Sequence, residues 1–328
     1  MGDVVIGLDL GGTQIRAARL DLALNILQRE DSLTLASEGL DSTLQRIKDA
    51  IYAVLPEDRS TVKGIGISAP GPLNPMTGVI VAPPNLPGWH NVPLEQILRD
   101  EFDMPVYVGN DANVAALAEV TRGAAKGFRH AIFITVSTGI GGGIIYDGRM
   151  LLGKVGLGAE VGHTIIIVGD EISSLEKSAA GPALARRARA AIEAGRETTM
   201  LQLAGGDINK VDARIIGQAA GEGDAVAQEI VDFSSKIVGL GIVSLLHLFN
   251  PEIIVIGGGV SKFGEPWFEQ IWTIVRENAL DAAYWRDIEI VPAGLGGAVS
   301  IIGAAALVLT EGGQSDVAEF ASRLNKYD

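Results

Sequence analysis

The stretch Val4–Asp21, VVIGLDLGGTQIRAARLD, decides the fold of this chain. Its first half alternates large apolar residues with smaller or polar ones at Ile6, Leu8 and Leu10, which is the period of a β-strand. Gly11–Gly12 follow and supply a turn in which positive φ angles carry no steric cost. A second β-compatible run comes after the turn, so the stretch predicts a hairpin closed by glycines.

Two polar side chains flank this first glycine turn, Asp9 before it and Thr13 after it. A turn without side chains brings backbone N–H groups close to a phosphate, and a neighbouring carboxylate holds Mg²⁺ through water. An ordinary hairpin turn has the same sequence pattern, so the stretch alone leaves both interpretations open.

A second stretch of the same kind, Ile132–Tyr146 or IFITVSTGIGGGIIY, favours the phosphate interpretation. It again reads as strand, glycine turn and strand, and when the two are superposed Gly139 falls on Gly11. The hydroxyl groups of Ser137 and Thr138 stand near the position of the carboxylate in the first copy. We therefore predict a duplicated nucleotide-binding fold, with one hairpin in each lobe and the phosphates between them.

Composition limits the classes of protein to which the chain can belong. Its 328 residues suffice for two domains, and 47% hydrophobic with 20% charged residues allow a large buried core. A net charge of −14 argues against a nucleic-acid partner, which requires clustered Lys and Arg. The absence of cysteine excludes disulfides and thiolate metal sites. With no basic leader and no apolar run of about 18 residues, the sequence predicts a soluble cytoplasmic protein without a membrane partner.

Strand and helix patterns alternate along the chain and predict an α/β fold with two lobes. We expect a small lobe of residues 1–112 plus about 300–328, a large lobe of 113–299, and a hinge between them that allows closure on a ligand. Strands are expected at 62–68, 106–109, 165–168, 251–256 and 288–291, and helices at 40–55, 94–102, 113–125, 178–194, 211–220, 225–249, 265–279, 298–310 and 317–324.

Two common nucleotide-binding fingerprints are missing, since the chain contains neither a Walker A loop nor a Gly-x-Gly-x-x-Gly after a strand. A third glycine cluster, Gly257–Gly259, does lie between an expected strand and an expected helix. Backbone without side chains leaves room there for a flat ring such as adenine. A close-packed turn between strand and helix would need the same glycines, so both interpretations stay open.

Asn110 and Asp111 end a strand at the edge where open α/β sheets bind their ligands. Asp111 is also suited to cap the helix expected at 113–125, and the two roles are compatible because a helix N-terminus fixes a carboxylate. In phosphoryl transfer such a carboxylate would act mainly by orienting the attacking hydroxyl.

Four further polar residues could bind a sugar, and each has a plainer explanation. Glu160 and His163 lie three apart on a glycine-rich loop, either as sugar ligands or as solvated loop residues. Glu176 belongs to a charged run that is typical of a surface. Asn85, which stands between prolines, is either a turn residue or an amide held for a ligand.

Taken together, the motifs of the chain resemble the ROK family, which comprises bacterial sugar kinases, open reading frames and repressors on the actin-like ATPase fold. The resemblance covers nearly the whole chain, the motifs follow the order of the family, and PPNLPGW resembles its glucokinase branch most. The motifs are DLGGT at 9–13, APGP at 69–72, PPNLPGW at 83–89, VGNDANVAALAE at 108–119, TVSTGIGGGII at 135–145, GAEVGHT at 158–164, PEIIVIGGGVS at 251–261 and GLGGAVSIIGAA at 294–305.

This resemblance implies roles for individual residues, of which Asp111 would be the base toward the 6-hydroxyl of the sugar. It implies that the phosphates of ATP and Mg²⁺ are held by Asp9, Gly11, Gly12, Thr13, Thr138 and Gly139. It further implies that adenosine is bordered by Gly258 and Gly259, and that the sugar is held by Asn85, Asn110, Asp111, Glu160, His163 and Glu176.

The chain departs from the family where many members carry three cysteines that bind zinc together with a histidine. Here His163 is followed by TIIIVGDEIS, and Ser174 stands where the last cysteine would be. We therefore predict no zinc site, and expect the strand at 165–168 to pack the loop in place of the metal.

The function implied is that of an ATP-dependent hexose kinase, most similar to glucokinase, with ATP and Mg²⁺ as cofactors and a homodimeric assembly. The alternatives are a kinase for mannose, fructose or an N-acetylhexosamine, a non-catalytic sugar-binding regulator, and an actin-like ATPase that needs no sugar. ROK repressors carry an N-terminal helix-turn-helix, and a first hairpin at Val4 together with the acidic charge favours the kinase.

Overall fold

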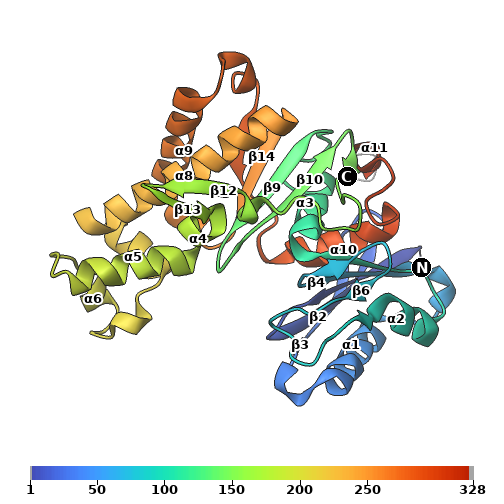
Figure 1. The fold of residues 1–328 in the computed structure, drawn as a ribbon. Coiled ribbons are helices and arrows are strands. Elements are labelled where there is room, and N and C mark those ends of the chain that lie inside the picture. The colour runs from blue at the N-terminus through green and yellow to red at the C-terminus, as the bar shows by residue number, and fades with distance from the viewer. Residues whose placement is uncertain (1, 325–328) are drawn as a thin grey trace. The chain divides into compact units, whose positions relative to one another are not determined.

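The computed structural model describes residues 2–324, which form two compact units (Figure 1). The first unit consists of residues 2–131, 143–159 and 293–324, and the second of residues 132–142 and 160–292. The chain therefore passes between the units four times, the last time between Pro292 and Ala293.

The first unit is built on a five-stranded sheet with the strand order β3-β2-β1-β4-β8. The first three strands are antiparallel, whereas β4 and β8 run parallel to β1, so that β1, β4 and β8 end at the same edge. The strands are β1 (Val4–Leu10), β2 (Gln14–Asp21), β3 (Ile26–Leu33), β4 (Val62–Ala69) and β8 (Val106–Asn110).

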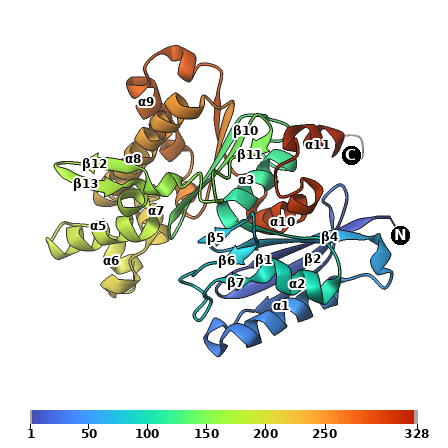
Figure 2. The ribbon, with the colours of Figure 1, turned by 45° about the vertical axis from the view of Figure 1, so that its right-hand side comes forward.

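Helices cover both faces of this sheet (Figure 2). Helices α1 (Leu40–Val54) and α2 (Leu94–Phe102) lie on one face, and α3 (Asp111–Thr121) and α10 (Val299–Leu309) on the other. The last helix is α11 (Val317–Leu324), which packs against α3. A small sheet is formed by β5 (Leu73–Asn74), β6 (Val79–Ile80) and β7 (Val92–Pro93).

Helix α10 packs directly on the backbone of the sheet, because the strands beneath it present glycines. A Cβ atom at Gly7 of β1 would lie 2.5 Å from the carbonyl oxygen of Ile301, and one at Gly66 of β4 would collide with the carbonyl oxygen of Ala304. Residues 301–307 of α10 are buried, and this close approach fixes the helix against β1 and β4.

A second five-stranded sheet has the order β11-β10-β9-β14-β15, and the chain leaves the second unit within β10, after Gly142. Its strands are β9 (Ala131–Val136), β10 (Ile140–Tyr146), β11 (Arg149–Met150), β14 (Ile253–Gly257) and β15 (Glu289–Pro292). The second unit also contains the hairpin β12 (Ile165–Val168) and β13 (Glu171–Ser174).

Helices make up most of the rest of the second unit. They are α4 (Leu175–Ala179), α5 (Gly181–Glu193), α6 (Met200–Leu203), α7 (Ala213–Gly221), α8 (Ala225–Phe249) and α9 (Glu265–Asn278). Helix α8 is long and apolar enough to cross a membrane by length and composition, which corrects the expectation that no such run occurs. It packs against α4, α5, α7 and α9, and most of its apolar window is buried, as in the core helix of a globular unit.

The secondary structure differs from the sequence prediction at a few places. The helix expected at 178–194 is two helices, because the chain is extended at Ala180 before Pro182 enters the first turn of α5. Strand β3 was not predicted, since seven of its eight residues are exposed and no apolar alternation marks it. Helix α3 begins two residues before the expected start, and its cap is Asn110 instead of Asp111.

Candidate functional site

The first glycine turn lies in the first unit and joins β1 to β2. The N–H group of Gly11 donates to the carbonyl oxygen of Gln14 at 2.9 Å, which closes the turn. The buried Thr34 holds it from outside: its hydroxyl donates to the carbonyl oxygen of Gly11 at 2.6 Å, and its N–H donates to that of Thr13 at 2.9 Å. Thr34 has no sequence signal and was not predicted as a site residue.

Asn85 lies directly against this turn. A Cβ atom at Gly12 would lie 2.9 Å from the Cβ atom of Asn85 and 3.1 Å from its carbonyl oxygen, so no side chain fits at this position. Asn85 is itself exposed. The structure therefore brings together one residue predicted for the phosphates and one predicted for the sugar.

Asp9 is the carboxylate at the end of β1, and only 16% of its side chain is exposed. Its pKa is raised from 3.8 to about 6, mainly by burial and in part by the nearby negative charge of Asp111. Arg16, whose guanidinium lies 3.5 Å away, and a hydrogen bond with the hydroxyl of Ser300 act in the opposite direction. Asp9 is thus a partly buried carboxylate that a bound cation would keep ionised.

Asn110 and Asp111 stand at the carboxyl edge of β8, where α3 begins. The Oδ1 atoms of both residues accept from the N–H of Ala112, at 3.0 Å for Asn110 and 2.8 Å for Asp111. Asp111 is exposed and lies in the first turn of α3. Its negative charge raises the pKa of Asp9, which lies on the other side of β4. The pair therefore presents an amide and a carboxylate at the edge where the three parallel strands end.

The second glycine turn lies in the second unit, between β9 and β10. The N–H of Ser137 donates to the carbonyl oxygen of Gly139 at 2.8 Å. The side chain of Glu176 supports this turn, because its Oε2 atom accepts from the N–H of Ile140 at 2.8 Å. A Cβ atom at Gly139 would lie 2.6 Å from the same oxygen, so any side chain here would displace the carboxylate of Glu176.

The third glycine cluster lies on this second turn. Gly258 has a φ of 93°, and a Cβ atom there would collide with the carbonyl group of Val136. A Cβ atom at the exposed Gly259 would lie 3.9 Å from the hydroxyl of Ser137. The carbonyl oxygen of Ser137 also accepts from the N–H of Gly181 at 2.7 Å, which ties the start of α5 to the turn.

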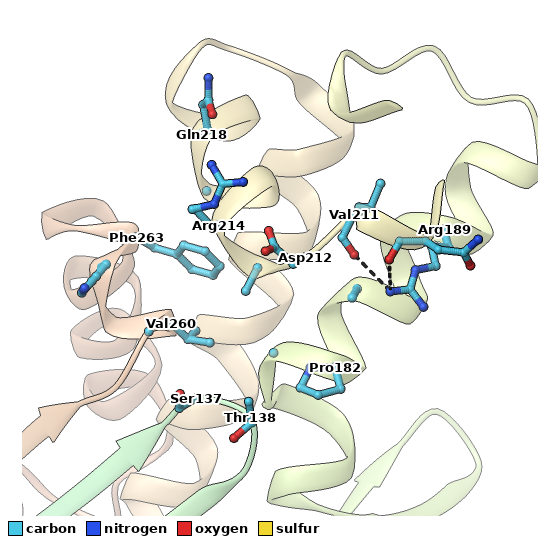
Figure 3. Close-up of a pocket in the computed structure, with 17 residues that line it drawn as sticks. Ser137, Thr138, Pro182, Arg189, Val211, Asp212, Arg214, Gln218, Val260 and Phe263 are labelled. Carbon is cyan, nitrogen blue, oxygen red and sulfur yellow. Dashed lines mark hydrogen bonds between the residues drawn. The ribbon is translucent and has the colours of Figure 1, made fainter. Parts of the chain in front are cut away.

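A cavity of about 690 Å³ opens at this junction and is lined by residues of the second unit. Figure 3 shows Ser137 and Thr138 of the glycine turn at one end of the cavity, with Val260 and Phe263 along one side. On the opposite side the guanidinium of Arg189 donates to the carbonyl oxygens of Asn209 and Val211 at 3.3 and 3.2 Å. The volume and the largely apolar lining suit a ligand of the size of a nucleoside.

Glu160 precedes a short 3₁₀ turn, Val161–His163, which His163 ends, and both residues are exposed. Gly162 in this turn packs on the carbonyl oxygen of Ile140, where a Cβ atom would collide. The turn and Glu176 therefore meet at the first residue of β10, directly after the second glycine turn.

The segment after His163, for which the sequence predicts no zinc site, is the β12–β13 hairpin. Four residue pairs join its strands, and the N–H of Leu175 donates to the carbonyl oxygen of Thr164 at 3.0 Å at its base. The hydroxyl of Ser174 caps α4 by accepting from the N–H of Lys177 at 3.2 Å. Among residues 2–324, no group of three or more His, Cys, Asp or Glu side chains is placed to hold a metal ion.

The strand expected at 165–168 forms at those residues, and its two faces differ. Ile166 and Val168 are half-buried, whereas Ile165 and Ile167 are 72% and 68% exposed. The backbone ladder of the hairpin holds the segment, and the apolar face is left at the surface.

The predicted site residues thus fall into two sets. The first unit holds Asp9, Gly11, Gly12, Thr13, Asn85, Asn110 and Asp111, and the second holds Thr138, Gly139, Glu160, His163, Glu176, Gly258 and Gly259. Each set gathers around its own glycine turn.

The chain is similar in sequence and in structure to known proteins. The sequence profile of the ROK family matches residues 5–311. A glucokinase of Thermotoga maritima is 33% identical over 93% of this chain and 96% of its own, and a xylose repressor of Caldicellulosiruptor bescii is 29% identical over 94% and 78%. The crystal structure of a ROK family glucokinase from Streptomyces griseus in complex with glucose and AMPPNP superposes with a TM-score of 0.76 at 32% identity, covering 93% of this chain and 98% of that one.

Proposed function

The chain belongs to the ROK family, and we propose that it is an ATP-dependent hexose kinase that phosphorylates the 6-hydroxyl group, with glucose as its preferred sugar. Its fold is the α/β actin-like ATPase fold of the sugar kinases in that family, as predicted. The observation that carries the proposal is the nucleoside-sized cavity, which opens at the second glycine turn and at Gly259 of the third glycine cluster.

In this proposal the second unit binds ATP. The adenosine would occupy the cavity beside Gly258 and Gly259, and the backbone N–H groups and the hydroxyl of Thr138 would meet the phosphates. A Cβ atom at Gly258 would collide with the backbone of Val136, and this supports a backbone that is kept free of side chains for close approach to a ligand. The first glycine turn, with Thr13, would act on the same phosphates during transfer.

Asp9 fits the role of a carboxylate near Mg²⁺. Its side chain is poorly hydrated and its pKa is raised, so a hard cation at this position would recover the cost of keeping it ionised. When bound, Mg²⁺ would neutralise charge on the β- and γ-phosphates.

Asp111 is the group that we propose to orient the hexose. Its carboxylate would accept a hydrogen bond from the 6-hydroxyl and take its proton as the oxygen bonds to the γ-phosphorus and the bond to the leaving ADP breaks. The exposure of Asp111 at the carboxyl edge of β8 leaves it accessible to a sugar. We propose that the remaining hydroxyls are held by Asn85, Asn110, Glu160, His163 and the second oxygen of Glu176.

The experiment is ADP release with ATP–Mg²⁺ and a panel of glucose, mannose, fructose and N-acetylhexosamines. We expect glucose to give the highest kcat/KM. We expect Asp111→Asn to lower kcat by about 10²–10⁴, the range for one acid–base group, with little change in glucose affinity by calorimetry. Asp103→Asn is the matched control, because Asp103 is an exposed aspartate in a left-handed conformation that asparagine tolerates.

Two results would contradict the proposal. One is a protein that binds glucose but releases no ADP with any sugar, which is the behaviour of a regulator. The other is ATP hydrolysis that no hexose accelerates, as in an ATPase that needs no sugar. A near-normal kcat in Asp111→Asn would refute the role of that residue alone.

We further propose that the enzyme is a homodimer that works in the cytoplasm without zinc, nucleic-acid or membrane partners, and that its lobes, 1–112 with about 300–328 and 113–299, close on the substrates. Sedimentation and elemental analysis test the assembly and the zinc content. About half of α8 is buried within its own unit, so only its exposed residues could contribute to a dimer face.

A further inference from the structure

Glu119 is a buried carboxylate on α3, eight residues after Asp111, and its residue is 1% exposed. It is bonded to three backbone N–H groups. Its Oε2 atom accepts from Ala124 at 2.7 Å, both oxygens accept from Gly294 at 3.1 Å, and Oε1 accepts from Leu295 at 3.2 Å. A buried carboxylate is tolerated when charge-assisted hydrogen bonds of this kind replace its hydration.

The segment that Glu119 binds is the one by which the chain re-enters the first unit. The last crossing lies between Pro292 and Ala293, and Gly294 and Leu295 are the second and third residues after it. A Cβ atom at Gly294 would lie 3.1 Å from the backbone nitrogen of Ala124, so the segment is in close contact with the end of α3. Glu119 therefore fixes the first-unit end of this crossing.

Residues 294–295 are followed by the helix that contacts Asp9. Helix α10 begins at Val299, and the hydroxyl of Ser300 in its first turn is hydrogen-bonded to Asp9. Glu119 thus sits on the helix that starts with Asp111 and holds the loop that leads to the partner of Asp9. The carboxylate of Glu119 thus connects the segments that carry Asp9 and Asp111, which have different roles in the proposed mechanism.

We propose that Glu119 is a positioning residue for phosphoryl transfer: it fixes residues 294–295 to α3 and thereby sets where Asp9 and Asp111 stand relative to each other. This inference rests on the proposed kinase function. A carboxylate is needed to accept these hydrogen bonds with both of its oxygens. Glutamine has only one accepting oxygen, and its NH₂ group would face backbone N–H donors to which it cannot bond.

The first test is steady-state kinetics of Glu119→Gln. We expect kcat to fall roughly 10- to 100-fold, the range for misplaced reacting groups, and the hexose KM to stay within about threefold. Thr121→Val is the matched control: Thr121 is a fully buried polar residue of the same helix, but its hydroxyl donates to the carbonyl oxygens of Leu117 and Ala118 and not to the crossing. It should retain the kcat of the unaltered protein.

The second test, hydrogen exchange, needs no activity. The amides of Ala124, Gly294 and Leu295 should exchange at least about tenfold faster in Glu119→Gln, and at the unaltered rate in Thr121→Val. If Glu119→Gln fails to fold, Gly294→Ala disturbs the same contact with the carboxylate left in place, and it should give the same faster exchange and lower kcat.

Unchanged exchange at these amides would overturn the inference, and so would an equal loss of kcat in Thr121→Val. A protein that phosphorylates no hexose would refute the proposed function, whereas the exchange result would still report whether Glu119 holds the crossing. The two failures are therefore distinguishable.

Discussion

Replacing Asp9 with asparagine should make the protein more stable at pH 8 while it abolishes phosphoryl transfer. Burial raises the pKa of Asp9 from 3.8 to about 6, so the folded protein holds the neutral acid more tightly than the unfolded chain does. The stability contributed by the neutral acid is fully present below about pH 3.8 and is lost as the pH rises through about 6. At 1.36 kcal/mol per pKa unit the loss is about 3 kcal/mol.

Asparagine carries no charge at any pH and escapes this loss. The pKa of about 6 already includes the attraction to Arg16, 3.5 Å away, so we expect a gain of up to about 3 kcal/mol at pH 8 and little at pH 4. The assay is hydrogen exchange of the β1 amides in increasing urea at several pH values, because it reports the free energy of opening of the first unit. Phosphoryl transfer is measured in the same preparations.

Asp31 on β3 provides the control with the opposite sign. A hydrogen bond from Arg29 lowers the pKa of Asp31, so its charged form is favoured in the folded protein and Asp31→Asn should destabilise the protein slightly at pH 8. If Asp9→Asn were less stable than the unaltered protein by the same amount at pH 4 and pH 8, burial could not be what raises the pKa of Asp9, and the reasoning would be refuted.

Three further substitutions test the glycine turns and the hairpin. Gly139→Ala should lower kcat/KM for ATP at least about tenfold, because its Cβ atom would lie 2.6 Å from Oε2 of Glu176 and push that oxygen away from the N–H of Ile140, which it supports; ATP titrations measure this. Thr34→Val removes the 2.6 Å hydrogen bond to the carbonyl oxygen of Gly11 and should cost about 1 kcal/mol in urea unfolding while it raises the KM for ATP. Ser174→Ala removes the cap of α4 and should cost about 1 kcal/mol, with a higher KM for glucose in the same assay.

The sequence predicted the parts of the site that depend on short-range pattern. Both glycine turns lie between strands of the expected period, and the helices 94–102, 225–249 and 317–324 have the expected bounds. The sequence also placed Asn110 at a sheet edge that binds ligands, and the structure puts Asp9 at the same edge because β1, β4 and β8 are parallel.

The parts that were missed depend on contacts between distant segments. Thr34 and Ser300 act through single hydroxyl groups that carry no motif, and Glu119 looks like any polar residue in an alanine-rich helix. Strand β3 is an exposed edge strand, so its polar residues give no signal of burial. Asn110 takes the cap because it is the last extended residue, which spacing alone does not reveal.

The glycines beneath α10 have a consequence for how substitutions would spread their effects. Gly7 and Gly66 make no polar contact with any proposed ligand group, yet a methyl group at either would lift the helix that carries Ser300. A survey of tolerated substitutions would therefore rank positions 7 and 66 beside the reactive aspartates. If catalytic residues were identified only by their intolerance of substitution, glycines beneath α10 that contact neither sugar nor nucleotide would be counted among them.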